Sequence, residues 1–296
     1  MFHTPVVDIY VTGACNLGCR YCFGEFDFKA GMSRSIFLQT LNFAQHAGAT
    51  AIEFCGGEPL LYTDLPWAVE TTRKHGFKKL ILRTNGLALP QHRSFVASNF
   101  DTVGVSLDGD VHSNDMMRPT KKLSALTAEE KFRIPLEEIS ALKSMNPKMQ
   151  ILLASVATKL NLDGLRSLAH ILVNEQIPLD LWKVHQFLPN NFRGQLNSQE
   201  FLLDPASFQL LSLDLARKVN GAFQLICRKS EEIDGSCLIV NRDGDILLNA
   251  KSVGNVDKHS PTILCGLLKE LGAEAAIKEN KQRTYKVLLG NNSEVK

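Results

Sequence analysis

Three cysteines stand close together near the N-terminus, and their spacing is suited to holding a metal centre. Cys15, Cys19 and Cys22 form the pattern C-x3-C-x2-C. Thiolate sulfur is a soft ligand that favours iron–sulfur clusters and zinc. Three thiolates converging on a four-iron cluster would leave one iron open to a substrate or cofactor. A structural zinc site needs a fourth ligand, which only Cys55 or His3 could supply. The pattern therefore favours the cluster over zinc or over three inert core thiols.

The other cysteines are widely spaced, and the odd total of seven fits a complete set of disulfides poorly. Cys55 stands beside two glycines and is expected to be a buried thiol rather than a ligand. Cys227, Cys237 and Cys265 are too scattered to bind an auxiliary cluster together. We expect these three to be buried or free thiols.

Strand-length apolar segments alternate with helical patterns over the first two thirds of the chain. Helices are expected from Ser33 to Gly48, after a cap at Asp64 with Pro66 in the first turn, and from about Leu162 to Gln176. Repeated strand–helix units predict a parallel sheet, in which chemistry gathers at the carboxyl ends of the strands. The expected strands are 6–11, 50–54, 79–83, 102–107, 149–157 and 181–187.

The unusual residues of the sequence fall at those strand ends. The three cysteines follow the first strand, Gly56-Gly57-Glu58 the second, Asn85 the third and Asp108 the fourth. We predict an α/β fold, a partial (β/α)6 TIM-like barrel with a C-terminal α+β extension. The expected division is a core barrel over 1–200 and an extension over 201–296 that covers the barrel mouth. The polar, Lys/Glu-rich segment 117–147, with its prolines, is interpreted as an insertion or mobile crossover.

The cysteine pattern, with Tyr21 before its last cysteine, resembles that of the radical S-adenosylmethionine (radical SAM) superfamily. The resemblance implies a [4Fe-4S] cluster bound by Cys15, Cys19 and Cys22, with S-adenosylmethionine on the open iron. It further implies reductive cleavage of S-adenosylmethionine to a 5′-deoxyadenosyl radical that abstracts a substrate hydrogen. The protein's part in such chemistry is to position the substrate and to exclude side reactions.

Later loops carry further likenesses to this superfamily. Cys55-Gly56-Gly57-Glu58-Pro59 resembles its GGEP motif, Thr84-Asn85-Gly86 its third-strand turn, and Ser106-Leu107-Asp108-Gly109 its SLDG motif. Arg118 stands as in a D-x-x-R tail and could pair with the methionine carboxylate, or it could be a solvated loop arginine. Ser155 could contact the cofactor or be a polar strand end. The residues implied to bind the cofactor are Tyr21, Gly56, Gly57, Glu58, Asn85, Ser106, Arg118 and Ser155.

The sixth strand gives a finer likeness. The segment 181–188, LWKVHQFL, resembles that of the viperin-like branch, which dehydrates nucleoside triphosphates. In that branch the lysine matching Lys183 contacts substrate phosphate, and His185 is a second catalytic candidate by position. The fifth strand departs from the branch, because Leu152, Leu153 and Ala154 stand where triphosphate-binding residues are expected. A small phosphorylated or nucleotide-like substrate is therefore expected rather than a triphosphate in particular.

Composition narrows the partners. The chain has 296 residues, 44% of them hydrophobic, and 33 Lys+Arg against 31 Asp+Glu give a formal net charge of +2. That balance disfavours an extended nucleic-acid surface and a disordered chain. No apolar run approaches the ~18 residues that a spanning helix needs, and no signal peptide is evident. We expect a cytoplasmic protein with no membrane partner.

Three functions compete on this basis. The first is a viperin-like radical SAM enzyme acting on a nucleotide-like or small phosphorylated substrate. The second is a radical SAM enzyme that modifies peptides without an auxiliary cluster. The third is a non-catalytic iron–sulfur sensor, which would need no cofactor-binding loops. Either enzyme would take electrons from a donor such as flavodoxin or ferredoxin.

Overall fold

The computed structural model describes residues 4–22, 31–120, 126–190, 192–233, 237–248, 251–273, 275 and 277. Its strands are β1 (Val6–Tyr10), β2 (Ala51–Cys55), β3 (Lys79–Thr84), β4 (Thr102–Ser106), β5 (Gln150–Ala157), β6 (Leu181–Gln186), β7 (Gln224–Arg228), β8 (Leu238–Val240), β9 (Asp245–Leu248) and β10 (Lys251–Asn255). Its longer helices are α1 (Arg34–His46), α2 (Leu65–Lys74), α3 (Leu89–Asn99), α5 (Ala128–Met145), α6 (Leu162–Asn174), α9 (Pro205–Val219) and α11 (Pro261–Glu270). Its short helices are η1 (Pro59–Leu61), α4 (Val111–Met117), α7 (Phe192–Leu196), α8 (Ser198–Phe201) and α10 (Ser230–Ile233).

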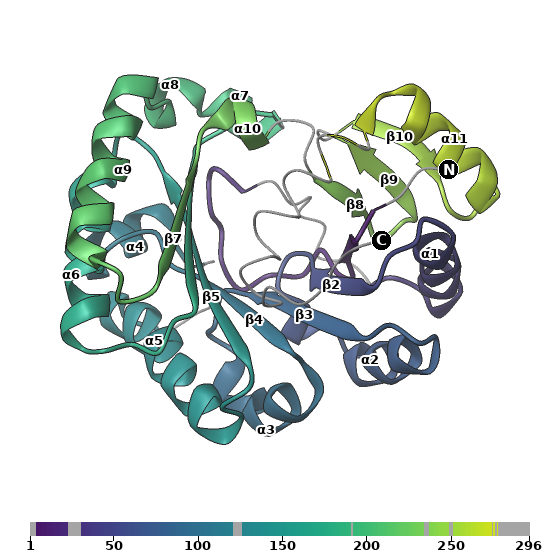
Figure 1. Ribbon diagram of the computed structural model, residues 1–296, viewed down its shortest axis with the longest axis horizontal. Helices are drawn as coiled ribbons and strands as arrows, with labels where there is room; N and C mark the ends of the chain where they lie inside the picture. The colour runs from purple at the N-terminus through teal and green to yellow at the C-terminus, as the bar shows by residue number, and fades with distance from the viewer. Residues whose placement is uncertain are drawn as a thin grey trace.

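The described strands form one sheet in the order β10-β9-β8-β1-β2-β3-β4-β5-β6-β7. Every neighbouring pair from β1 to β7 is parallel, as strands joined by helical crossovers must be. The sheet curves strongly, with helices α1 to α6 along its outer side (Figure 1). The two edges, β10 and β7, do not pair with each other, so the barrel is partial. The predicted fold class is confirmed.

The main core lies between the outer side of the sheet and the helices. Its members come from alternate strand positions and from the apolar faces of the helices, and they include Phe37, Phe54, Phe132 and Trp182. A second, smaller cluster closes the inside of the barrel at the amino ends of the strands. It consists of Val6, Ala51, Ile81, Leu152 and Leu181, one residue from each of five strands. This apolar layer forms a floor for everything above it.

The segment that the sequence predicted to be an insertion or mobile crossover is instead helical over much of its length. Helix α5 begins with a capping box between Thr127 and Glu130, which satisfies exposed backbone N–H groups at its first turn. Pro135 lies inside this helix, where its ring packs against Gly86 of the β3 turn. The packing of α5 on the sheet outweighs the helix-breaking tendency of proline, which is why composition alone was misleading.

The helix caps agree in part with the sequence prediction. The Ser33 hydroxyl accepts from the Ile36 N–H at the start of α1, as expected. Asp64 stands at the N-cap position of α2 but makes no capping hydrogen bond, because its carboxylate pairs with Arg34 at 2.8 Å.

The C-terminal part extends the sheet at both edges. β7 adds to β6 in parallel, and β8 adds to β1 in parallel, followed by the antiparallel strands β9 and β10. The predicted boundary near residue 200 therefore falls within one continuous sheet, and the division into two domains stays a prediction. No helix among the described residues is both long and apolar enough to cross a membrane.

Candidate active site

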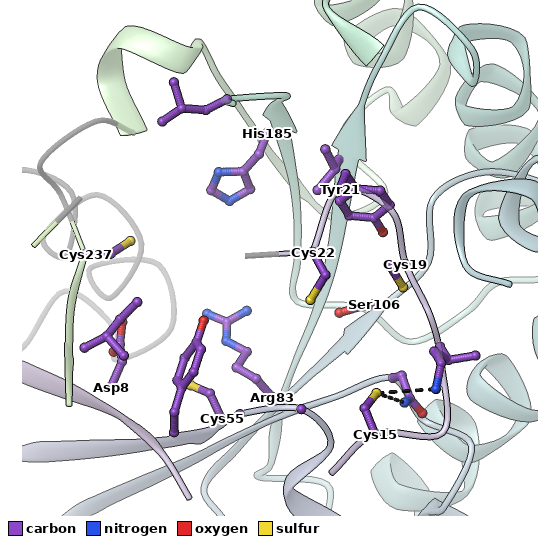
Figure 2. Close-up of a pocket in the computed structure, with 18 of the residues that line it drawn as sticks. Asp8, Cys15, Cys19, Tyr21, Cys22, Cys55, Arg83, Ser106, His185 and Cys237 are labelled. Carbon is purple, nitrogen blue, oxygen red and sulfur yellow. Dashed lines mark hydrogen bonds between the residues drawn. The ribbon is translucent and has the colours of Figure 1, made fainter. Parts of the chain in front are cut away.

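A cavity of about 430 Å³ opens inside the curve of the sheet, at the carboxyl ends of its parallel strands. All but two of the site residues predicted from the sequence line it. They are Cys15, Cys19, Tyr21, Cys22, Gly56, Gly57, Asn85, Ser106, Arg118, Lys183 and His185. Figure 2 shows Cys15, Cys19 and Cys22 on one side of the cavity, with Asp8 and Cys237 on the opposite side.

The three clustered thiols face the same cavity from one loop, residues 11–22, called here the cysteine loop. No group of three or more His, Cys, Asp or Glu side chains in the described part of the chain is placed to hold a single metal ion. In an iron–sulfur cluster, however, each cysteine binds a different iron, so its thiolates need not meet at one ion. Three thiols around a shared space are thus a donor set that fits a cluster.

The first half of the cysteine loop is held by the turn that follows β3. The side-chain amide of Asn85 donates to Asn16 Oδ1 at 2.7 Å, and its nitrogen lies 3.9 Å from Cys15 Sγ. The N–H of Leu17 donates to the same sulfur at 3.4 Å. These contacts fix the first thiol, whose pKa burial raises to about 11.

The second half of the loop is held by a buried network around Asp108. This carboxylate is fully buried and accepts from Arg118 Nη1 at 2.9 Å, from the Val156 N–H at 2.6 Å, and from the Tyr21 hydroxyl. Arg118 also donates to the Tyr21 oxygen at 3.0 Å. Burial opposes the charge on Arg118, but Tyr21, Cys19 and Asp108 raise the pKa of the guanidinium overall. Arg118 is therefore a buried, partnered cation rather than a solvated loop arginine.

The two remaining predicted residues, Glu58 and Ser155, do not line the cavity. Glu58 is fully buried and accepts from the Thr84 hydroxyl and the Asn85 N–H, both at 2.8 Å, which ties the β2 loop to the β3 loop. Ser155 lies on the core side of β5, where it donates to the Leu107 carbonyl and accepts from Trp182 Nε1 at 2.9 Å. Both side chains support loops, so a direct contact of either with a cofactor stays a prediction that this placement disfavours.

Comparison with known proteins now bears on this geometry. Residues 9–125 match the model of the radical SAM superfamily. This chain contains a radical SAM domain. The match covers the cysteine loop and the carboxyl ends of the first four strands. The superfamily implies an iron–sulfur cluster and S-adenosylmethionine as cofactors.

Two curated relatives extend the similarity. An S-adenosylmethionine-dependent nucleotide dehydratase of Selenomonas ruminantium is 27% identical over 192 residues, which is 60% of this chain and 64% of the relative. A probable GTP 3′,8-cyclase of Methanococcus maripaludis is 34% identical over 102 residues, 33% of this chain and 34% of the relative. This chain thus spans less than two thirds of the length of either relative.

A solved structure supports the fold. Native anSMEcpe with bound AdoMet and a Cp18Cys peptide superimposes with a TM-score of 0.69 at 18% identity, covering 96% of this chain and 87% of that one. At this identity the likeness speaks for the fold alone. It agrees with the partial barrel that surrounds the cavity of this radical SAM domain.

The glycines of the GGEP-like loop have a structural task within the domain. A Cβ on Gly57 would lie 2.2 Å from the Ala14 carbonyl oxygen, and one on Gly56 would lie 2.4 Å from that of Thr12. The N–H groups of Gly57 and Glu58 donate to the same two carbonyls at 2.7 Å. The loop after β2 therefore docks directly on the cysteine loop. That Gly56 and Gly57 also bind the cofactor stays a prediction.

A charged layer lies above the apolar floor of the radical SAM barrel, and the sequence analysis missed most of it. Asp8, Glu53 and Arg83 line the cavity together with Lys183, each from the middle or end of an otherwise apolar strand. A signal was present, since Asp8, Glu53, Arg83 and Lys183 each stand within or near the end of a mainly apolar strand segment. Only the register of the sheet reveals that these charges share one face.

Burial and neighbouring charge govern the two residues predicted to be catalytic. Burial first, then Arg83, lower the pKa of Lys183 to about 7, while Glu53 acts in the opposite direction. Burial, reinforced by Lys183 and Arg228, lowers the pKa of His185 well below its ordinary value. His185 is therefore a neutral imidazole at pH 7, and Lys183 is poised between its charged and neutral forms.

The remaining cysteines lie in different surroundings. Cys55 and Cys237 line the cavity, with Cys55 Sγ 3.6 Å from the Glu53 carbonyl oxygen. Cys227 packs against the main core, and Cys265 is buried in α11. Cys227 and Cys265 are free thiols in the structure. Cys55 is buried as expected, but its position at the cavity wall brings it nearer to the chemistry than the sequence indicated.

Proposed function

We propose that this chain is a radical SAM enzyme that cleaves S-adenosylmethionine reductively at a [4Fe-4S] cluster and removes a hydrogen atom from a small nucleotide-like or phosphorylated substrate. When bound, the cluster supplies the electron for a cleavage that yields a 5′-deoxyadenosyl radical. Cys15, Cys19 and Cys22 would hold three irons. Flavodoxin or ferredoxin is the class of electron donor that suits such a cluster.

One observation carries the proposal. The three thiols open onto the same cavity as Arg118, Lys183 and His185, so the proposed cluster ligands and substrate-side groups share one cavity. A sensor protein would need the thiols but not a cavity lined with buried charged side chains. Because Asp108 and Asn85 fix the two halves of the cysteine loop, the thiols are held in place before any ligand arrives.

The chain's own residues would divide the work of binding and proton transfer. Arg118 is a buried cation beside the cysteine loop and is suited to pair with a carboxylate of the cofactor. Lys183, with a pKa near 7, can hold or release a proton at neutral pH and so serve as a general acid or base. Neutral His185 can accept one hydrogen bond and donate another.

The proposal has a first test in the ligand set. Anaerobic reconstitution of the wild-type protein is expected to give about four irons per chain. Cys19→Ala should lose the cluster, as judged by iron content and the visible absorption of the protein. Cys265→Ala, which changes a buried thiol in α11, is the matched control and should keep it. A Cys19→Ala protein with an intact cluster would contradict the assignment.

The second test concerns turnover and substrate. Incubation with S-adenosylmethionine and dithionite is expected to release 5′-deoxyadenosine, and one member of a panel of nucleotides and sugar phosphates should stimulate that release strongly. No release above a cluster-free control would favour the iron–sulfur sensor instead.

A peptide is the second candidate substrate. Strand β5 presents apolar Val156 to the cavity, and Leu152 and Leu153 are fully buried, so this strand contributes no phosphate-binding side chain. The related fold of anSMEcpe is seen with a Cp18Cys peptide bound. Stimulation of 5′-deoxyadenosine release by a peptide, with none by the phosphorylated compounds, would select this alternative.

A further inference from the structure

A half-buried arginine, Arg83, lies in the cavity and belongs to none of the motifs that identify the cofactor loops. It is on β3, directly before the Thr84-Asn85-Gly86 turn, and its side chain is only 20% exposed. Figure 2 shows its guanidinium reaching into the cavity between the cysteine loop and Cys237. A guanidinium that is largely removed from water needs charged or polar partners, so the groups around Arg83 indicate what it binds.

Glu53 of β2 supplies part of that compensation. Its Oε1 lies 2.8 Å from Arg83 Nε and its Oε2 lies 3.4 Å from Arg83 Nη2, so the two carboxylate oxygens accept hydrogen bonds from one edge of the guanidinium. The Glu53 side chain is 8% exposed. This contact sets the direction in which the planar group points.

Gly104 of β4 makes room for the arginine. The two residues are paired in register, and a Cβ on Gly104 would lie 2.7 Å from both Cδ and Nη1 of Arg83. The Arg83 side chain therefore lies across the backbone of β4, in the space that a side chain at position 104 would otherwise fill. Strand β4 is built to seat this arginine inside the barrel.

A second cation shares the space. Lys183 of β6 lines the same cavity and is buried. Burial is the largest cause that lowers the pKa of Lys183; Arg83 and Arg228 lower it further, whereas Glu53 and Cys237 act to raise it. Arg83 and Lys183 thus place two cations in one cavity, and because burial opposes the charge on Lys183, a negatively charged group bound beside it would stabilise its protonated form.

We propose that Arg83 binds a phosphoryl group of the substrate, and that Glu53 both orients Arg83 and limits its affinity by competing for the guanidinium. This inference rests on the proposed function, whose substrate class it narrows to compounds that carry a phosphoryl group. Arg83 and Lys183 together supply the phosphate-binding side chains that the apolar fifth strand lacks. Arginine suits the role, because its fork of N–H donors matches phosphate oxygens.

Isothermal titration calorimetry of the reconstituted protein with inorganic tripolyphosphate tests the site without requiring turnover. Wild-type protein should bind the probe saturably. Arg83→Gln should weaken binding about 10- to 100-fold, the range expected for losing charge-assisted hydrogen bonds. Arg217→Gln, a change at an exposed arginine of α9, is the matched control and should leave the affinity unchanged.

A change at Glu53 distinguishes binding from a merely structural role, because it should act in the opposite direction. Glu53→Gln removes the competing charge and keeps an acceptor for Arg83, so the affinity for tripolyphosphate should rise about 3- to 10-fold. Gly104→Ala should weaken binding by displacing Arg83. Arg83→Gln could fail to fold because Glu53 is left buried without its partner. The double variant Glu53→Gln/Arg83→Gln removes both charges and should bind tripolyphosphate more weakly than the wild-type protein does.

Several outcomes would overturn the inference. They are the absence of saturable binding by wild-type protein, an unchanged affinity in Arg83→Gln, or a shift in the same direction for the Glu53 and Arg83 variants. A nucleoside that binds as tightly as its 5′-triphosphate would also overturn it. Comparing the affinity for the nucleotide with that for tripolyphosphate shows whether the site prefers the phosphates of a nucleotide or free polyphosphate. Failure of the proposed function shows differently, as tripolyphosphate binding without release of 5′-deoxyadenosine in the presence of any compound.

Discussion

The carboxylate of Asp108 is the shared acceptor in the hydrogen-bond network that holds the second half of the cysteine loop. Changing it to an amide is the sharpest test of that network. In Asp108→Asn, one oxygen can still accept from the Val156 N–H. The other position becomes an NH2 group that faces Arg118 and the Tyr21 hydroxyl, both of which are hydrogen-bonded to the carboxylate in the native protein. The change thus leaves a buried cation without its counter-charge.

The magnitude follows from burial. Asp108 is fully buried and the Arg118 side chain is 13% exposed, so water screens their interaction only weakly. Removing one partner of such a pair costs about 3–5 kcal/mol of unfolding free energy. At about 2–4 °C per kcal/mol for domains of this general size, the melting temperature should fall by roughly 6–20 °C.

Thermal unfolding of the reconstituted protein, followed by circular dichroism, measures the effect. Glu70→Gln is the control, because it breaks an exposed ion pair on α2 whose loss should cost less than about 1 kcal/mol. In a double-mutant cycle, Asp108→Asn and Arg118→Met together should cost about 2 kcal/mol less than the sum of the single changes. If Asp108→Asn melts within 2 °C of wild type, or if the cycle is additive, the reasoning about the buried pair is wrong.

Three further predictions concern the same site. Because the folded-state pKa of Lys183 is lowered to about 7, the unfolded chain binds more protons than the folded chain between pH 7 and about 10.5. Lys183 therefore makes the unfolding free energy rise with pH over that window, and its full destabilising contribution is present below the window. In urea titrations at pH 7 and 9.5, Lys183→Met should show a smaller rise than wild type and be about 1–4 kcal/mol more stable at pH 7, and equal slopes would count against the assignment. Gly57→Ala places a Cβ 2.2 Å from a carbonyl oxygen of the cysteine loop and should reduce the iron bound per chain, whereas Gly266→Ala, with no atom within 4 Å of its new Cβ, should keep the iron content and gain about 0.5–1 kcal/mol. Asn85→Ala removes the 2.7 Å hydrogen bond to Asn16 and should cost about 1 kcal/mol and broaden the electron paramagnetic resonance signal of the reduced cluster; an unchanged signal would show that the loop holds itself.

The sequence was sufficient to predict the barrel because its parallel strands are buried on both faces. Such strands are short, nearly continuous apolar segments, and each of the first six was predicted within about two residues of its observed ends. The cysteine, glycine and asparagine residues after these strands were then placed by topology alone, since parallel strands bring their carboxyl ends to one side. Local pattern and global fold agree over this part of the chain.

Prediction failed where contacts between distant segments decide the outcome. Helix α5 carries a proline that local propensity counts as a helix breaker, and only its packing against Gly86 makes the helical conformation favourable there. Arg83 was missed for a similar reason, because the residue that seats it, Gly104, is on another strand. Ser155 was expected to be either a cofactor contact or a polar strand end, and the alternation of β5 turns it to the core beside Trp182. These outcomes depend on contacts between distant segments, which local sequence does not encode.

The pairing of β1 with β8 has a consequence for how the protein is made. β1 is synthesised long before β8, so one of its edges is covered only when Ile239 and Val240 arrive to pair with Asp8 and Ile9. At about 5–20 residues per second, that wait lasts roughly 10–50 s. During it the nascent chain displays an unpaired strand edge, the kind of surface on which chains aggregate. Slow translation or chaperone binding over this interval would therefore govern how much of the protein reaches its native form.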